Sequence, residues 1–349
     1  MKHGRISIIG HFGKGVTLLN GQTIKTKMLT EELERRFGTD QVVRYDTSGK
    51  WKALFNIPAR LLRAFINSDN IIILPAYKGV RYIMFLIALM RPFFRNRGLH
   101  YAVVGGWLPE FIENKPFLSR WLHCLNGIYV ETTTMKNALE AKGYSNIFIL
   151  TNFKNVNIAT IPDQCPVPES PYRLCTFSRV MKGKGIIEAS RVIENINSKL
   201  GYTAYTLDIF GPIWSADKEW FESEMKDRQA CITYKGAVPA DESVKILKDY
   251  FLLLFPTRFK TEGIPGTIID AYAAGLPVVS SRWNSFSDVI DDHTTGIGYN
   301  FDDFAELSEV LLNILLNPES ILKMKCACVA KARDYSAETA VSSLASNLV

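Results

Sequence analysis

Residues 255–280 read FPTRFKTEGIPGTIIDAYAAGLPVVS. The apolar run that ends at Phe255 predicts a strand, which is followed by a loop, a small-residue helix over 267–274 and a second strand over 277–280. This order is typical of a βαβ unit, in which a helix connects two parallel strands of one sheet. The stretch therefore indicates an α/β fold.

The loop and the start of the helix carry the residues that suggest binding. Gly263 and Gly266 let the backbone approach a ligand closely, and the free N–H groups around Thr267 favour an anion such as a diphosphate. Glu262 ends the loop and Asp270 lies on the helix, so a carboxylate stands on each side of the anion position. Taken alone, two such acids are more often solvated surface charges, and the whole stretch is what favours a ligand site.

The same alternation of short apolar strands and longer helices extends along the chain. We expect strands over 6–9, 41–45, 70–75, 101–104, 127–130 and 147–150, and then over 173–177, 206–210, 251–255 and 277–280. The expected helices cover 23–37, 51–65, 80–90 and 134–142, and then 186–199, 241–248 and 267–274. A stretch rich in proline and asparagine over 151–171 separates the two series and predicts a linker.

A chain of 349 residues is too long for one ordinary core. We therefore expect two doubly wound α/β domains, residues 1–160 and 161–330, with a C-terminal helix at about 330–349 that packs back on the first. Two such domains would face each other across a cleft between the carboxyl ends of their sheets, where open α/β sheets bind ligands.

Composition restricts the location and the chemistry. Residues 1–160 carry 22 Lys and Arg against 10 Asp and Glu, a net charge of +12, and the remainder carries 19 against 25, a net charge of −6. The longest apolar run, 83–90, is far shorter than the ~20 residues that a membrane-spanning helix needs, so we expect a cytoplasmic protein. The six cysteines include no CxxC pair, and we predict no metal site and no cofactor.

Three further segments place cations or glycines where strands end. They read FSRVMKGKGI over 177–186, LDIFGP over 207–212 and YKGAVP over 234–239. Together with 255–280, these segments resemble in content and order the family-four retaining glycosyltransferases. The resemblance extends weakly into the N-terminal half, and it implies the GT-B fold of two facing Rossmann-like domains.

The resemblance also implies the reaction. A sugar would move from a nucleotide-diphosphate donor, a UDP- or GDP-sugar, to an acceptor, with retained anomeric configuration and no bound metal. Arg179, Lys184 and Glu262 would be the catalytic residues: the two cations stabilise the leaving diphosphate, and Glu262 orients the donor sugar. Asp270 stands where the family usually has Glu, and it would bind the ribose. The implied donor-binding set is Arg179, Lys184, Gly211, Gly236, Val238, Glu262, Gly263, Ile264, Pro265, Gly266, Thr267 and Asp270.

The N-terminal half offers weaker signals. Gly13, Lys14 and Gly15 form a flexible glycine loop after the first strand, which we expect to face the cleft. Lys25 and Lys27 begin a helix, where cations oppose the helix dipole, so they either face an anion or are simply exposed. Many relatives have a histidine after a central strand, whereas this chain reads VGGW over 104–107. We therefore predict no catalytic histidine, and interpret His11, His100 and His123 as structural or surface residues.

Acceptor and location are less constrained. No acidic residue occurs over 71–109, and Arg91, Arg95 and Arg97 lie beside aromatic residues, which suits contact with an anionic membrane or else a solvated loop. We expect a glycan or polyprenyl-diphosphate-linked acceptor in the synthesis of bacterial capsule, O-antigen or exopolysaccharide, peripheral attachment to the inner face of the cytoplasmic membrane, and no binding of nucleic acid. The alternatives are a non-catalytic subunit that binds nucleotide-sugar, or a nucleotide-sugar epimerase on the same fold.

Overall fold

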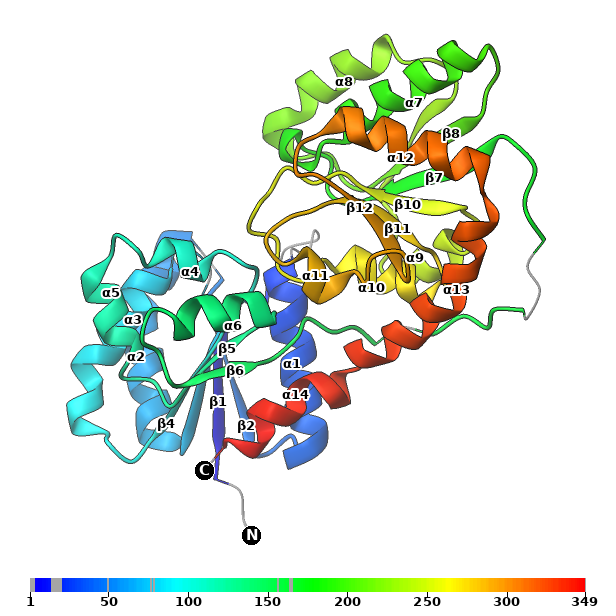
Figure 1. The fold of residues 1–349 in the computed structure, drawn as a ribbon. Coiled ribbons are helices and arrows are strands. Elements are labelled where there is room, and N and C mark those ends of the chain that lie inside the picture. The colour runs from blue at the N-terminus through cyan, green and yellow to red at the C-terminus, as the bar shows by residue number, and fades with distance from the viewer. Residues whose placement is uncertain are drawn as a thin grey trace. The chain divides into compact units, whose positions relative to one another are not determined.

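The chain divides into two compact units. The computed structural model describes residues 4–13, 21–48, 50–75, 77, 79–155, 157–162 and 166–348, apart from the side chains of residues 50–54. Unit 1 comprises Met1–Lys154 and Tyr335–Val349, and unit 2 comprises Asn155–Asp334. Each unit contains one parallel sheet with helices packed on it (Figure 1).

Unit 1 is built on a six-stranded sheet with the order β2-β1-β3-β4-β5-β6, in which all pairs are parallel. Its strands are β1 (Ile6–Gly10), β2 (Val42–Asp46), β3 (Asn70–Ile73), β4 (Gly98–Ala102), β5 (Gly127–Val130) and β6 (Ile147–Ile149). Its helices are α1 (Gly21–Phe37), α2 (Lys50–Asn67), α3 (Val80–Met90), η1 (Arg91–Phe93), α4 (Leu108–Phe111), α5 (Pro116–Leu122), α6 (Thr133–Glu140) and α14 (Ala337–Ser346).

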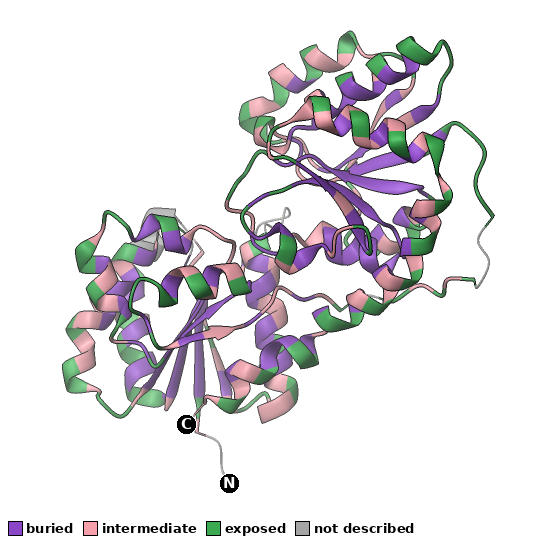
Figure 2. Ribbon diagram, in the orientation of Figure 1, coloured by how far each residue is buried: buried purple, intermediate pink, exposed green. Residues whose placement is uncertain are grey.

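Side chains of the unit 1 strands point alternately to two faces, as the pleat requires. Ile6 and Ile8 pack with residues of α1 and α14, whereas Ile9 packs with residues of α2, α3, α4, α5 and α6. Both faces of the sheet are therefore covered, and the inner strands β1, β3, β4 and β5 are buried, whereas the edge strands β2 and β6 are buried only in part (Figure 2). Helices α2, α3 and α5 thus lie on one face of the sheet, and α14 lies on the other.

The expected strand over 101–104 is displaced, because β4 begins at Gly98. Glycine usually indicates a turn, but a Cβ at this position would lie 2.4 Å from Oδ1 of Asn70, so close packing requires it here. His100 on this strand is buried, and its Nδ1 lies 3.1 Å from the Tyr129 hydroxyl. Burial lowers the pKa of His100 to about 4, consistent with the structural interpretation of this histidine.

Unit 2 has a second six-stranded parallel sheet, with the order β12-β11-β10-β7-β8-β9. Its strands are β7 (Tyr172–Phe177), β8 (Tyr205–Phe210), β9 (Ile232–Gly236), β10 (Leu252–Phe255), β11 (Val278–Ser281) and β12 (Gly296–Tyr299). Its helices are η2 (Lys182–Lys184), α7 (Ile186–Leu200), η3 (Ser215–Asp217), α8 (Lys218–Lys226), α9 (Ser243–Leu247), α10 (Gly266–Ala273), α11 (Phe286–Val289), α12 (Phe304–Leu316) and α13 (Glu319–Ala332), followed by η4 (Arg333–Tyr335).

Helices α7, α8 and α12 cover one face of the unit 2 sheet, and α9, α10 and α11 lie on the other (Figure 1). The core on the first face includes Ile193, Leu207, Leu252 and Leu311, all fully buried. Within the part of the chain that the structure describes, no helix has the length and apolar character needed to cross a membrane.

We predict that α14 is essential to the stability of unit 1. Leu344 is fully buried in the cluster that contains Ile6 and Leu29. Leu344→Ala should lower the free energy of unfolding by ~2–5 kcal/mol, since it removes buried methyl groups and leaves a cavity. Urea unfolding of the full chain measures this loss, with the exposed Ser342→Ala on the same helix as control. Equal stability of the two variants would contradict the packing.

Candidate functional site

The order of the strands in unit 2 places two loops beside each other. β7 and β10 are neighbours, and the chain continues from β7 to β8 and β9 on one side, and from β10 to β11 and β12 on the other. Open α/β sheets bind ligands at the carboxyl ends of the strands where the direction of winding reverses in this way. The loop after β7 carries Arg179 and Lys184, and the loop after β10 carries Glu262.

Lys184 and Glu262 form an ion pair that joins the two loops. The Lys184 ammonium bonds to Oε1 of Glu262, and Thr257 donates from its hydroxyl to the same oxygen over 3.0 Å. The Lys184 and Glu262 side chains are 15% and 18% exposed, and the Phe255 and Phe259 rings lie 5.2 and 5.4 Å from the ammonium. Because this pair is partly shielded from water, its charges interact more strongly than those of a surface pair.

Two glycines allow the loops to come this close. Gly185 has a φ of 64°, and a Cβ on it would lie 2.1 Å from the carbonyl oxygen of Pro256. A Cβ on Gly183 would lie 2.4 Å from the Phe259 ring. The Arg258 N–H donates to the Gly183 carbonyl over 2.9 Å, which fixes the loops by their backbones. Position 185 therefore needs glycine both for its conformation and for the space that it leaves.

Arg179 is positioned by the loop that follows β8. Val180 and Ile213 form an isolated parallel bridge, and this bridge sets Trp214 beside Arg179, with the guanidinium carbon 5.0 Å from the ring centroid. A guanidinium stacked in this way keeps its N–H groups available for an anion in the plane of the fork. Arg179 and Lys184 therefore both extend from the loop after β7, as the sequence analysis expected.

The two glycines expected near a nucleotide base lie on adjacent strand ends. Gly211 follows β8 with a φ of 131°, and a Cβ there would lie 1.9 Å from the carbonyl oxygen of Ser178. Its N–H donates to the carbonyl of Gly236, the last residue of β9, over 2.8 Å. Val238 follows two residues later and is partly buried. The loops after β9, β8, β7 and β10 thus bring these predicted residues to one edge of the sheet.

The first N–H groups of α10 have no side-chain cap from the residue that precedes the helix. Gly263 and Ile264 are buried, and the helix is preceded by Pro265, which provides no side-chain cap for the first N–H groups. Helix α10 then begins with Gly266, and the buried Thr267 hydroxyl has no hydrogen-bond partner among the described residues. An uncapped helix N-terminus attracts anions through its N–H groups and its dipole.

Asp270 begins the second turn of α10 and is only 3% exposed. The interpretation of this acid as a solvated helix residue is therefore wrong. Side chains of a helix lean toward its N-terminus, so the Asp270 carboxylate is directed to the turn that starts at Gly266. Among the described residues, no group of three or more His, Cys, Asp or Glu side chains could hold a metal ion.

Two contributors to the site were missed by the sequence analysis. Thr257 supports Glu262, and Trp214 supports Arg179. Thr257 lies within 255–280, five residues before the glutamate, so a hydroxyl at a strand end was a usable signal. Trp214 offered no signal, because its contact depends on the pairing of two loops that are distant in sequence.

The predicted glycine loop of unit 1 is described in part. Gly13 is buried with a φ of 68°, whereas Lys14 and Gly15 lie outside the described residues. The anion that Lys25 meets is the protein's own Glu131, 2.6 Å away, and the two side chains are 2% and 3% exposed. Of the two alternatives for these lysines, Lys25 faces an anion and is not exposed. Lys27 is partly buried.

Two arginines of the basic segment 91–97 bond to the protein itself, where the sequence suggested a membrane contact or a solvated loop. Arg91 donates to the Arg97 carbonyl over 2.6 Å. Arg97 donates to the Phe65 carbonyl over 3.1 Å and forms a 2.6 Å ion pair with Asp69. Arg95 is exposed. Two of the three arginines therefore hold this loop in place.

Comparison with known proteins assigns the fold and a domain. Residues 171–317 match the family model described as group 1 glycosyl transferases. The amylovoran biosynthesis glycosyltransferase AmsK of Erwinia amylovora is 26% identical over 174 residues, which cover 46% of this chain and 40% of AmsK. The match thus spans less than half of that relative.

Solved structures resemble the whole chain. Sucrose-phosphate synthase from Thermosynechococcus elongatus has a TM-score of 0.76 at 13% identity, covering 98% of this chain and 97% of that one. HepE from Anabaena, in complex with UDP and glucose, has a TM-score of 0.73 at 13% identity and covers 99% of both chains. The predicted α/β class and GT-B fold are confirmed, and the matched domain lies within unit 2.

We predict that Lys184 and Glu262 are energetically coupled in the ligand-free protein. A double-mutant cycle with Lys184→Met and Glu262→Gln should give a coupling of about 1 kcal/mol or more, because both side chains are largely shielded. The control pair Lys218 and Glu222 on α8 is 62% and 53% exposed and should give about 0.5 kcal/mol or less. Urea unfolding measures both cycles, and equal couplings would contradict the shielding.

Proposed function

We propose that this protein is a glycosyltransferase that moves a sugar from a nucleotide-diphosphate sugar to a glycan or lipid-linked glycan. The observation that carries the proposal is the Lys184–Glu262 pair, held where the winding of the unit 2 sheet reverses, with the uncapped start of α10 on the same loop as Glu262. The match of residues 171–317 to group 1 glycosyl transferases supports the same reaction class.

The leaving group is the nucleoside diphosphate, whose negative charge grows as its bond to the sugar breaks. Lys184, Arg179 and the first N–H groups of α10 supply positive charge and hydrogen-bond donors for it. The Thr267 hydroxyl, buried without a partner among the described residues, is a further donor there. Fixed donors of this kind need no reorganisation during the reaction, so they stabilise the transition state more than water would.

The ion pair has two consequences for donor binding. Lys184 neutralises Glu262, which would otherwise repel a diphosphate, and its ammonium has three N–H donors, so it can bond to a phosphate without leaving the carboxylate. Both contacts of Glu262 described above use Oε1. We infer that Oε2 accepts a hydrogen bond from a hydroxyl of the donor sugar and thereby orients its ring.

Transfer retains the anomeric configuration of the sugar and is independent of metal ions in this proposal. The acceptor hydroxyl attacks from the face that the diphosphate leaves, and its proton passes to a phosphate oxygen of the departing group. This route needs no protein base, which agrees with a VGGW sequence over 104–107 and with His100 buried in the sheet. Asp270 binds the ribose, directly or through a water molecule.

The acceptor follows from the comparisons by analogy. AmsK, a relative in sequence, is named for amylovoran biosynthesis. WaaB, a relative in structure, is named as a lipopolysaccharide outer core galactosyltransferase. We infer that this chain acts in the synthesis of a bacterial surface polysaccharide, at the inner face of the cytoplasmic membrane, on a glycan or a polyprenyl-diphosphate-linked glycan. HepE was solved with UDP and glucose, which supports a UDP-sugar as the first donor to test.

Loss of either member of the pair should abolish transfer. Lys184→Ala and Glu262→Ala should each slow turnover about a hundredfold or more, the rate equivalent of ~3 kcal/mol of transition-state stabilisation. Release of UDP or GDP from a panel of donor sugars measures turnover, and thermal unfolding verifies the fold. Lys182→Ala is the matched control, since Lys182 is an exposed lysine in the same turn.

Three results would contradict parts of this proposal. Near-normal turnover in a folded Lys184 or Glu262 variant removes that residue from the site. Thermal stabilisation by a nucleotide-sugar without any transfer favours the non-catalytic subunit. Loss of turnover on chelation of divalent cations would exclude metal independence.

Asp270→Asn should raise the donor KM much more than it lowers kcat. A carboxylate that binds ribose contacts a part of the donor that does not react, so its loss removes binding common to the ground and transition states. Asp227→Asn, at the exposed end of α8, is the control. Steady-state kinetics with the donor varied measures both constants, and a defect confined to kcat would show that Asp270 acts elsewhere.

A further inference from the structure

The exposed large apolar side chains of unit 1 gather on one side of its sheet. Those that the structure describes belong to residues 55–117, and the described parts of α1 and α14, on the other side, contribute none. The eight are Phe55, Leu62, Ile66, Tyr77, Phe85, Leu89, Phe93 and Phe117. Six of them lie on α2, α3 and α5, which pack on one face of the sheet. Exposed apolar side chains that gather on one side of a domain favour a binding partner there.

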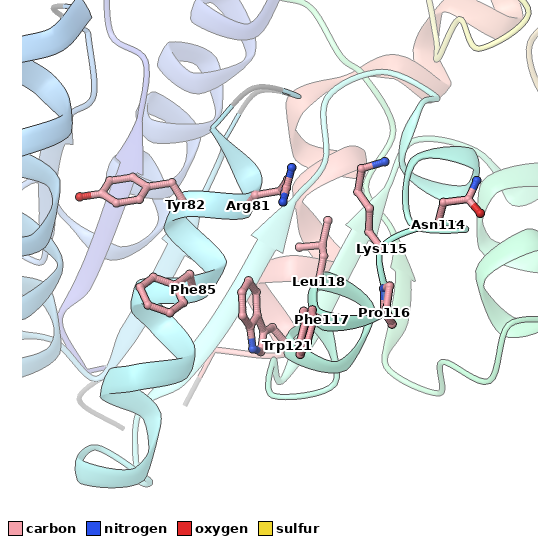
Figure 3. Close-up of a pocket in the computed structure, with 9 residues that line it drawn as sticks. All are labelled: Arg81, Tyr82, Phe85, Asn114, Lys115, Pro116, Phe117, Leu118 and Trp121. Atoms are coloured by element: carbon pink, nitrogen blue, oxygen red, sulfur yellow. The ribbon is translucent and has the colours of Figure 1, made fainter.

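Part of this surface is hollowed. A groove of about 820 Å³ lies between α3 and α5, and its lining includes Arg81, Phe85, Lys115, Phe117, Leu118 and Trp121 (Figure 3). This volume falls within the ~300–1,000 Å³ of small-molecule pockets. None of the described lining residues is acidic.

The groove has a polar end and an apolar end. Arg81 is in the first turn of α3 and Lys115 directly precedes α5, whereas Phe85 and Trp121 lie further along the two helices, with the Phe117 ring near Trp121 (Figure 3). The Phe85 and Phe117 rings have their centroids 5.6 and 6.5 Å from that of Trp121. This arrangement suits an amphipathic ligand with an anionic head and a long apolar chain.

Charge distinguishes the two sides of unit 1. The described side chains of residues 55–122, the segment that contains most of α2 and all of α3, α4 and α5, include 8 Lys and Arg against 3 Asp and Glu, a net charge of +5. Helices α1 and α14 together carry 4 of each, a net charge of zero. The apolar side is thus also the cationic side, a combination that favours an anionic lipid surface over an apolar protein partner.

We propose that the face formed by α2, α3, η1 and α5 binds an anionic lipid bilayer, with one lipid seated in the α3–α5 groove. The lipid phosphate lies at Arg81 and Lys115, and its chain follows Phe85, Phe117 and Trp121. Arg63, Arg95 and Arg120 are exposed on the same segment and contact neighbouring headgroups. The inference rests on the proposed function for its reason to act at a membrane, but lipid binding itself requires neither donor nor turnover.

The test is co-sedimentation of the full chain with vesicles. Wild-type protein should bind vesicles of equal parts phosphatidylglycerol and phosphatidylcholine, less so as salt is raised, and not bind vesicles of phosphatidylcholine alone. Phe85→Ser with Phe117→Ser should weaken binding about tenfold or more, because both side chains lose their burial in the lipid. The control pair Tyr202→Ser with Leu316→Ser removes similarly exposed apolar residues of unit 2 and should have no effect.

The contribution of the cations and the insertion of Trp121 into the lipid are tested separately. Arg81→Gln with Arg120→Gln should weaken binding about fivefold for each charge removed, whereas the exposed Lys218→Gln with Lys226→Gln on α8 should not. Arg91 and Arg97 are left intact, since they hold their loop. Phosphatidylglycerol with brominated chains should quench tryptophan fluorescence, and Trp121→Phe should lose most of that quenching while thermal unfolding shows an intact fold.

The inference is overturned if the wild-type protein does not bind anionic vesicles. It is also overturned if the Phe85 and Phe117 double variant binds as tightly as its control, or if the fluorescence of Trp121→Phe is still quenched by the brominated lipid. These failures are separable from failure of the proposed function. If the protein transfers sugar from a nucleotide-sugar to a soluble acceptor but does not bind vesicles, only the lipid site is contradicted. If it binds vesicles as expected but neither binds a donor nor turns it over, only the transferase function is contradicted.

Discussion

The close approach of two backbones at Gly185 is the constraint on which the unit 2 site depends. Where a side chain would meet the Pro256 carbonyl, glycine lets the loops after β7 and β10 touch. That contact sets Lys184 against Glu262 and holds both charges partly out of water. Removing a charge from water raises the free energy of the folded state unless the charge has a partner. Either residue alone at this position would therefore destabilise the fold. The same loop leads from Glu262 to the start of α10, which has no side-chain cap.

Much of the architecture could be predicted from sequence, because buried parallel strands and amphipathic helices leave strong patterns. The helix over 80–90 and the strand over 127–130 coincide with α3 and β5. Other elements lacked such patterns. Helix α8 is short, at nine residues, and buries one side chain, Phe221, so its apolar face is too small to stand out in the sequence. The strand β4 starts at a glycine whose packing against Asn70 involves a residue 28 positions earlier.

The candidate site likewise contains residues that could be predicted from the sequence and residues that could not. Cations, glycines and acids at strand ends were visible as motifs, because their chemistry is carried by residue type and spacing. Their supports were not visible. Lys25 could be identified as a cation near an anion, but its partner Glu131 is 106 residues away and is brought near by the fold. Likewise, the net charge of the N-terminal half said nothing of which arginines face outward, and Arg97 proves to bind Asp69.

The return of α14 to unit 1 also bears on how the protein is made. All six strands of the unit 1 sheet precede unit 2 in the chain, and domains commonly fold in the order in which they emerge during synthesis. Yet Val341 and Leu344, which cover the α1 side of this sheet, are translated after the whole of unit 2. Until then Ile6, Ile8 and Leu29 lack part of their cover. Unit 1 should thus reach its full stability only after unit 2 has been translated, with an apolar surface left for chaperones to recognise meanwhile.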